Sequence, residues 1–507
     1  MPKPFTPEIL PALEHVQELE AFTDAHEAVL RISEIYQKHC EMIQKAFDHL
    51  CNNEGDSLAE ALQTIKTATY PYAAIKVDTK DLNKDVSLSF GVAHEPGVYG
   101  ITLTRPDLFE NYYREQFALI MERHNVPVYV GISNTPIPLP FAIDPSAASL
   151  DPEQLWQMHN AFVLPNLTRI DDSIVNCTFE PENGQPKPLA HFTAERVDYS
   201  LQRLHHYTGT NPEHFQGFVL LTNYQRYIDE FIQIGLHEVE NGSTYSHFVM
   251  PGDVVHSNPR FDKTETTGEH PKHLPQMPAY HLKMPDGQGI TFINIGVGPS
   301  NAKNITDHVA VLRPHCWLML GHCAGLRANQ VLGDYVLAHA YVREDRVLDQ
   351  DLPTWIPVPP IAEIQVALQE AVLNIAELNN EEHDIHSLKV RMRTGTVVTT
   401  DNRNWELRIN ELSERFRQSR AVALDMESAT IAGNGFRFRV PYGTLLCVSD
   451  KPLHGELKLK GMANTFYRDR VSQHLKIGLE TCRILREKSV ENLHSRKLRG
   501  FDEPPFR

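Results

Sequence analysis

The sequence lacks paired cysteines, and this absence excludes two kinds of structural support. Its seven cysteines are scattered, with no Cys-x-x-Cys pair among them. Such spacing disfavours both a zinc site and a disulfide framework, and several of the thiols lie in apolar runs. We therefore expect the thiols to be reduced and the chain to fold without a structural metal or disulfide bonds.

The sequence also lacks long apolar runs and an excess of positive charge. No stretch approaches the roughly 18 uncharged apolar residues that cross a membrane. The first residues carry Glu and His where a signal peptide is apolar, so we expect a cytoplasmic protein. The 48 Lys and Arg residues face 65 Asp and Glu residues, for a net charge of −17. This balance disfavours a general binder of nucleic acid or anionic membranes, and a phosphorylated substrate would need a local basic pocket.

The length of 507 residues exceeds one ordinary core, so two or more domains are expected. Helical periodicity covers residues 7–67, and strand patterns follow at 72–77, 86–92, 97–103 and 126–132. Helices followed by a small sheet predict an N-terminal α+β domain.

A linker-like break, EPENGQPK, places the boundary of this domain near residue 185. Strands and helices then alternate up to a long final helix, which predicts an α/β domain. The expected organisation is 1–185, 186–490 and a frayed basic tail over 491–507.

Acidic residues follow two apolar, strand-like runs in the second domain. One run ends in the cluster Asp425-Met426-Glu427, and the next, after a predicted helix, ends at Asp450. Open α/β sheets bind ligands beyond the carboxyl ends of their strands. Two carboxylates there could divide a polar reaction, one holding hydroxyls and the other giving a proton. The plainer alternatives are acids that stabilise a helix N-terminus and, for Met426, a core position.

A glycine loop, Gly296-Val-Gly298-Pro-Ser-Asn301, lies between a predicted strand and a predicted helix. Taken alone, a Gly-x-Gly pair usually marks only a tight turn. Its position at a strand end would also allow Gly298 and Asn301 to line a binding site, and the helix N-terminus could bind an anion.

The motif Asp-Met-Glu-Ser-Ala before a helix, with Val-Ser-Asp after the next strand, resembles the purine nucleoside phosphorylase and nucleosidase superfamily over residues 215–485. The resemblance implies a mixed sheet flanked by helices. It also implies that Met426 and Glu427 grip the ribose and that Asp450 protonates the purine at N7. The motif 321–327, the run 333–341 and the N-terminal extension are similar to the nucleosidases that act on AMP.

Two departures from the phosphorylase pattern favour water over phosphate as the nucleophile. Phosphorylases clamp inorganic phosphate with arginines, and the corresponding places here hold Tyr224 and Met319. Arg226 lies close to the first of these, and a shift in alignment could restore it. The sequence names no residue that activates water.

A 5′-phosphate would still need cations, because a forked guanidinium suits phosphate oxygens. Arg327 is the first candidate, followed by Lys451, Arg226 and Arg343, and surface exposure is the alternative for each. Trp405 could stack on the adenine or belong to the core.

The resemblance, together with the departures from the phosphorylase pattern, predicts hydrolysis of AMP to adenine and ribose 5-phosphate without metal or organic cofactor. The resemblance further implies activation by ATP, inhibition by phosphate and a homohexamer, with the N-terminal domain serving regulation or assembly. A phosphate-dependent purine nucleoside phosphorylase and a non-catalytic nucleotide sensor remain the alternatives.

Overall fold

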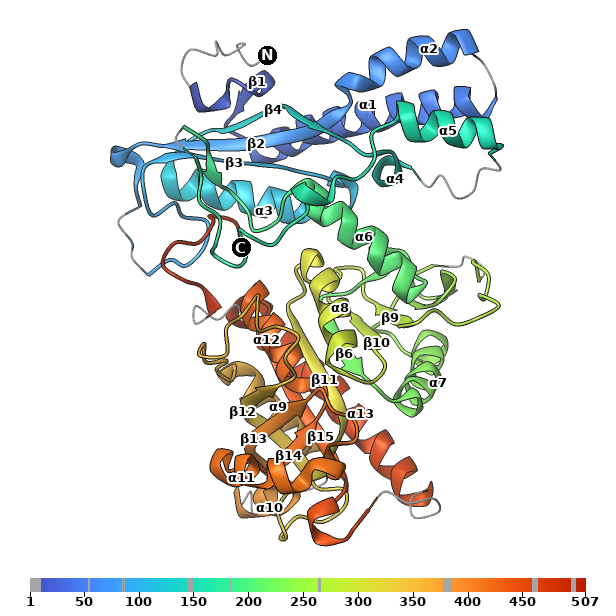
Figure 1. Cartoon of the computed structure of the whole chain (residues 1–507), viewed down its shortest axis with the longest axis vertical. Helices are drawn as coiled ribbons and strands as arrows, with labels where there is room; N and C mark the ends of the chain where they lie inside the picture. The colour runs from blue at the N-terminus through green and yellow to red at the C-terminus, as the bar shows by residue number, and fades with distance from the viewer. Residues whose placement is uncertain are drawn as a thin grey trace. The chain divides into compact units, whose positions relative to one another are not determined.

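The structure is a computed structural model that divides into two compact units. It describes all residues except 1–10, 53–54, 84, 86, 144–149, 183, 263–265, 377–384, 458–463 and 494–497. Unit 1 comprises Met1–Gln202 with Arg499–Arg507, and unit 2 comprises Arg203–Leu498. Figure 1 labels the elements of both.

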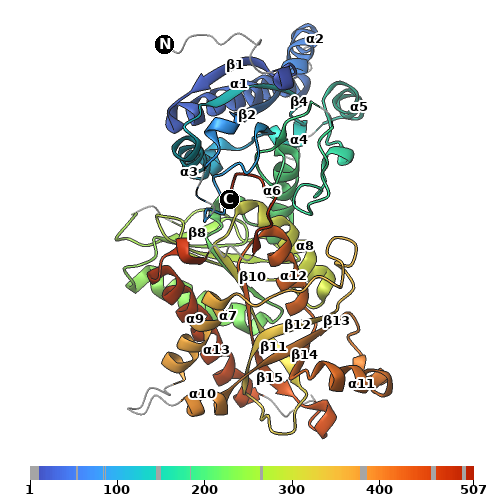
Figure 2. The same ribbon diagram turned by 90° about the vertical axis from the view of Figure 1, so that its left-hand side faces the viewer.

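Unit 1 is an α+β domain with a five-stranded sheet in the order β1-β4-β2-β3-β5. Its long helix α1 begins where the Asp24 side chain accepts a hydrogen bond from the Glu27 N–H, and its apolar stripe packs on β2 and β4 beside α3 (Figure 2). The elements are β1 (Gln17–Phe22), α1 (Ala25–Cys51), α2 (Gly55–Thr64), β2 (Thr69–Val77), β3 (Gly97–Thr102), α3 (Pro106–His124), β4 (Val128–Pro136), α4 (Leu139–Ala142), α5 (Pro152–Ala161), β5 (Lys187–Pro188) and α6 (Ala194–Thr208).

Two sequence predictions in this unit are wrong. The helix expected from residue 7 gives way to β1, which pairs antiparallel with β4 from Gln17 to Phe22; residues 7–10 lie outside the described residues. The strand expected at 86–92 is absent among its described residues, and the Gly91 N–H instead donates to the carbonyl of Pro505. In both places a partner distant in the sequence overrides the local pattern.

The structure divides the chain later than the predicted boundary near 185. Lys187–Pro188 forms β5, which pairs with β3, so the stretch after the linker-like break still belongs to unit 1. The tail over 491–507 is not frayed where it is described. The Phe506 ring is fully buried against Tyr112 and Phe117, because an apolar residue near the chain end completes this core.

Substituting Phe506→Ala is expected to lower the free energy of unfolding by about 3 kcal/mol, because it removes a buried aromatic ring and leaves a cavity. Urea denaturation of the full chain measures this loss. Phe501→Ala serves as the control, since Phe501 is 95% exposed. Equal stability of the two variants would contradict the packing of the chain end.

Unit 2 is an α/β domain built on a ten-stranded mixed sheet in the order β14-β13-β12-β15-β11-β6-β10-β9-β7-β8. Because β11 pairs with β14 as well as β15, five of these strands close into a barrel. Helix α8 packs with α12, while α7 and α9 pack with α13. The strands are β6 (Phe218–Thr222), β7 (His247–Met250), β8 (Val254–Ser257), β9 (Ala279–Lys283), β10 (Ile290–Asn294), β11 (Cys316–Gly325), β12 (Tyr335–Glu344), β13 (Met392–Thr400), β14 (Ala423–Asp425) and β15 (Tyr442–Asp450). The helices are α7 (Gln225–Asn241), α8 (Pro299–Val309), α9 (Ala362–Ile375), α10 (Ile385–Arg391), α11 (Ile409–Ser419), α12 (Ser428–Phe438) and α13 (Asn464–Glu487).

Four strands of unit 2 run parallel and side by side, in the order β10, β6, β11 and β15 (Figure 1). Their carboxyl ends therefore meet at one edge of the sheet, where such sheets bind ligands. In the part of the chain that the structure describes, no helix is long and apolar enough to span a bilayer.

Candidate active site

The carboxylate of Glu427 joins three strand ends. It follows β14, and its Oε1 accepts a 2.7 Å hydrogen bond from the N–H of Gly298, which follows β10. Its Oε2 accepts a 2.9 Å bond from the amide of Asn223, which follows β6. Glu427 is 1% exposed. Two donors thus fix a buried carboxylate at the sheet edge and leave its other lone pairs for hydroxyl groups.

Helix α12 sets the direction in which Glu427 points. Asp425 accepts the N–H of Ser428 at 2.9 Å, which satisfies an end group at the start of the helix. At the other end, a Cβ at Gly435 would lie 2.4 Å from the ring of Tyr442, so only glycine allows this close approach to β15. The small residues of α12 therefore let it lie against the barrel.

The two acids of this turn have different surroundings. Burial, and then the charge of Asp425, raise the pKa of Glu427 to about 8. Burial also raises the pKa of Asp425, but hydrogen bonds from Ser428 and Thr399 (2.6 Å from Thr399 Oγ1) oppose that rise. Because Asp425 has the stronger support for its charge, we infer that Glu427 is the acid of the pair that holds the shared proton longer.

For the reaction that the sequence predicts, replacing Asp425→Asn is expected to shift the acid limb of the kcat/KM profile toward lower pH. The substitution removes the charge that raises the pKa of Glu427, so Glu427 ionises at lower pH in the free enzyme, whose ionisations kcat/KM reports. Initial rates at low substrate across the pH range measure the shift. Asp286→Asn, in an exposed turn, is the control. An unmoved acid limb would argue against coupling of the two acids.

Asp450 ends β15 at the same edge of the sheet. Leu424 of β14 and Asp450 of β15 pair with the same residue of β11, Ala324, from its two sides. The hydroxyl of Ser449 donates to Asp450 Oδ1 at 2.6 Å and lies 3.3 Å from the carbonyl of Cys323. If Asp450 is protonated, it can donate to Ser449, which then donates to Cys323, so the site accommodates both states of the acid.

The glycine loop meets Glu427 through its backbone. Gly298 has a φ of +112°, which favours glycine, and Pro299 begins α8 directly after it. Asn301 is half-buried, and its amide donates to the carbonyl of Val297 at 3.3 Å. Gly298 thus contributes directly to the site, while Asn301 braces the loop.

Met426 and Trp405 occupy different environments. Met426 is half-buried between the two acids. Trp405 is 4% exposed and packs edge-on against Phe416 in an apolar cluster with Leu326 and Leu424. This placement favours the core alternative for Trp405 over stacking on a base.

The candidate cations do not converge. Lys451 is buried and lies 2.7 Å from Glu456, so a carboxylate already neutralises it. Arg327 is exposed beyond β11 and donates to the carbonyl of Arg420, and Arg343 donates to the carbonyl of Leu352. Arg226 lies in the first turn of α7, three residues after Asn223, which contacts Glu427. These positions argue against a phosphate grip by Lys451, Arg327 or Arg343.

The sequence predictions missed Asn223 and left His322 unassigned. Asn223 Oδ1 is buried and has no hydrogen-bond partner among the described residues. The His322 ring lies 4.3 Å from that of Tyr224, the cap residue of α7, while Met319 is buried in β11. The signal that could have found Asn223 is its position directly after an apolar strand. No group of three or more His, Cys, Asp or Glu side chains suited to a metal occurs among the described residues.

Comparisons with known proteins agree with this architecture. A family model described as the N-terminus of bacterial AMP nucleoside phosphorylase matches residues 27–186, and one described as the phosphorylase superfamily matches residues 251–480. An AMP nucleosidase of Escherichia coli is 50% identical over 443 residues, covering 86% of this chain and 89% of that protein. A guanosine phosphorylase of Halorubrum lacusprofundi is 24% identical over 222 residues, 43% of this chain and 84% of the other. A solved AMP nucleosidase from Bacteroides thetaiotaomicron is 27% identical, with a TM-score of 0.42 over 58% of this chain and 99% of that one.

Proposed function

The chain belongs to the AMP nucleosidase family, and from this premise we infer that it hydrolyses the N-glycosidic bond of AMP to adenine and ribose 5-phosphate. The observation that carries the inference is the 50% identity over 86% of the chain, which spans both units. The site adds a chemical rationale, since a buried carboxylate and a second acid follow the two strands that flank β11.

In the proposed reaction the bond between C1′ and N9 breaks, and its electron pair goes to the adenine. Asp450 gives a proton to N7, which makes the base a better leaving group. Glu427 accepts hydrogen bonds from the ribose hydroxyls and stabilises the positive charge that develops at C1′. The oxygen of water bonds to C1′, and the proton that it loses restores Asp450 or passes to solvent.

Asn223 supports this scheme as a positioning residue. Its amide holds Glu427, and its unpartnered Oδ1 offers an acceptor for a ribose hydroxyl or for the attacking water. We propose Arg226 for the 5′-phosphate, because it follows Asn223 at the start of α7. Gly298 and Met426 would line the sugar.

The reaction with and without inorganic phosphate tests the hydrolase assignment. Adenine release from AMP is expected to proceed in phosphate-free buffer and to yield ribose 5-phosphate. An absolute requirement for phosphate, with a ribose 1-phosphate derivative as product, would instead establish a phosphorylase. Tight binding of AMP with no adenine released over hours would establish a sensor.

The family resemblance also supports proposals about regulation and assembly. We propose a cytoplasmic homohexamer that ATP activates and phosphate inhibits, with unit 1 serving regulation or assembly. Size-exclusion chromatography with light scattering, and rates with each effector, test these points. A monomer whose rate responds to neither effector would contradict them.

A further inference from the structure

Unit 2 contains a basic cavity that the reaction does not use. Its volume is about 690 Å³, and its lining comes from the turn after β11, from α10 and from the start of β13. Arg327, Lys389 and Arg393 line it, and none of its lining residues, all of which the structure describes, is acidic. A cluster of three cations is unexpected in a chain with a net charge of −17 and calls for a functional explanation.

The positive charges of the basic cavity are held mainly by neutral groups. Arg327 donates to the carbonyl of Arg420 at 2.6 Å, and Arg393 donates to those of Lys389 and Asn329 at 2.8 and 3.0 Å. Arg393 also forms an ion pair with the buried carboxylate of Asp334, 3.7 Å from its Nε, which offsets part of its charge. Backbone carbonyls orient the guanidinium groups but do not neutralise them, so the cavity retains a positive field.

A buried donor in the same lining points to a missing acceptor. Gln330 is 1% exposed, and its Oε1 accepts the N–H of Arg327 at 2.9 Å. Its Nε2 is buried without a hydrogen-bond partner among the described residues, and so is Arg393 Nε. A buried donor left unpaired destabilises the fold, and a hydrogen bond to a ligand oxygen would remove that cost.

The basic cavity is distinct from the catalytic cleft. Thr394 lines the cavity near the start of β13, whereas Thr399, which holds Asp425, lies near the other end of that strand. Five residues of extended strand span about 16 Å. Along this strand, the lining residue Thr394 is thus well separated from the residue that supports Asp425.

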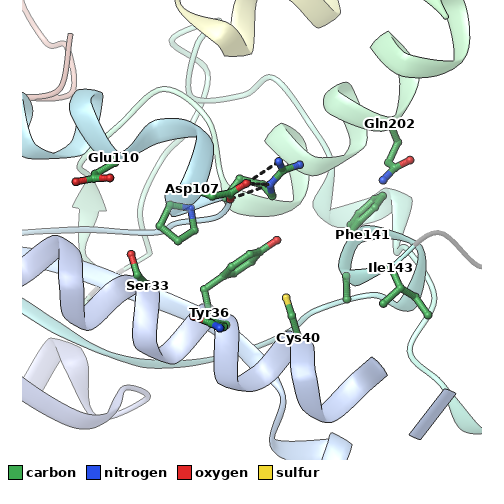
Figure 3. Close-up of a pocket in the computed structure, with 12 residues that line it drawn as sticks. Ser33, Tyr36, Cys40, Asp107, Glu110, Phe141, Ile143 and Gln202 are labelled. Carbon is green, nitrogen blue, oxygen red and sulfur yellow. Dashed lines mark hydrogen bonds and ion pairs between the residues drawn. The ribbon is translucent and has the colours of Figure 1, made fainter. Parts of the chain in front are cut away.

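A cavity in unit 1 provides a contrast. It measures about 520 Å³ and is lined by Tyr36, Cys40 and Phe141 together with Arg105, Asp107 and Glu110 (Figure 3). The guanidinium of Arg105 donates to the carboxylate of Asp107 at 2.9 and 2.7 Å, so the one cation among the described lining residues is already paired. An anion is thus favoured in the basic cavity and not in this one.

We propose that the basic cavity binds a phosphorylated small molecule. The phosphate oxygens would meet Arg327, Lys389, Arg393 and the Gln330 amide. The volume exceeds what a bare phosphate fills, so an organic group would occupy the remainder. This assignment is independent of the reaction in the cleft.

Titration calorimetry on the full chain tests the proposal, with the cleft first saturated by a non-hydrolysable C-nucleotide analogue of AMP. The probes are ATP and inorganic phosphate. Wild type is expected to bind one further ATP per chain. Lys389→Glu and Gln330→Glu are each expected to weaken that binding at least about tenfold, because each places a carboxylate against the anion. Lys272→Glu, at an exposed lysine outside the cavity, is the matched control and should bind as wild type.

The outcomes separate the parts of the proposal. Absence of ATP binding outside the filled cleft, or equal affinities of wild type and both cavity variants, would overturn it. Binding of phosphate as tight as that of ATP would overturn the organic part of the ligand. Melting temperatures near that of wild type confirm that the variants fold, and unchanged AMP hydrolysis by Lys389→Glu in anion-free buffer would support a site apart from the chemistry.

Discussion

Asp450→Asn is expected to lower kcat for AMP by about 10²–10⁴-fold while leaving binding of a C-nucleotide analogue nearly unchanged. The range is the usual contribution of a positioned general acid. The asparagine amide can still donate a hydrogen bond to N7, but it has no proton to transfer. Adenine release measured by chromatography gives kcat, and calorimetry gives the affinity for the analogue.

A substrate that needs no acid sharpens this test. A nucleotide of an N7-methylated purine already carries the positive charge that protonation would supply. Asp450→Asn should therefore cleave it far closer to the wild-type rate than it cleaves AMP. Asp286→Asn, in the exposed turn before β10, is the control for removing a carboxylate outside the proposed site. Normal AMP turnover in Asp450→Asn would refute the general-acid role.

Glu427→Gln is expected to lower kcat/KM for AMP by about 10²–10³-fold, the scale of removing one preorganised electrostatic contact. Glutamine retains an oxygen that can accept the Gly298 N–H, so the loop geometry is preserved. What is lost is the negative charge that stabilises the cation at C1′. Glu269→Gln, at an exposed position, is the control.

Comparing AMP with its 2′-deoxy analogue shows whether Glu427 acts on the ribose. Wild type should prefer AMP, because the 2′-hydroxyl bonds to the carboxylate. In Glu427→Gln that preference should shrink, as a double-mutant cycle requires for two groups in contact. An unchanged preference would place the carboxylate away from the sugar hydroxyls.

The sequence by itself predicted that two acids in short motifs, Glu427 and Asp450, lie at strand ends. Glu427 and Asp450 each end an apolar run, and strands of one sheet bring such ends to a common edge. The glycines of the loop before α8 could be singled out for the same reason, because they also follow a strand end. The sequence also predicted the fold class of unit 2, because strand-like and helix-like patterns alternate along it.

Only the tertiary structure decided where the cations and the unit boundary lie. Arg327 follows a strand end just as Arg226 does, yet it lines the basic cavity and donates to the carbonyl of Arg420. Asn223 gained its role from a contact with Glu427, which lies far from it in the sequence. The chain end, read as a frayed tail, belongs to unit 1 because Phe506 is buried there. Motifs fix what a residue can do, whereas long-range pairing fixes which residues it meets.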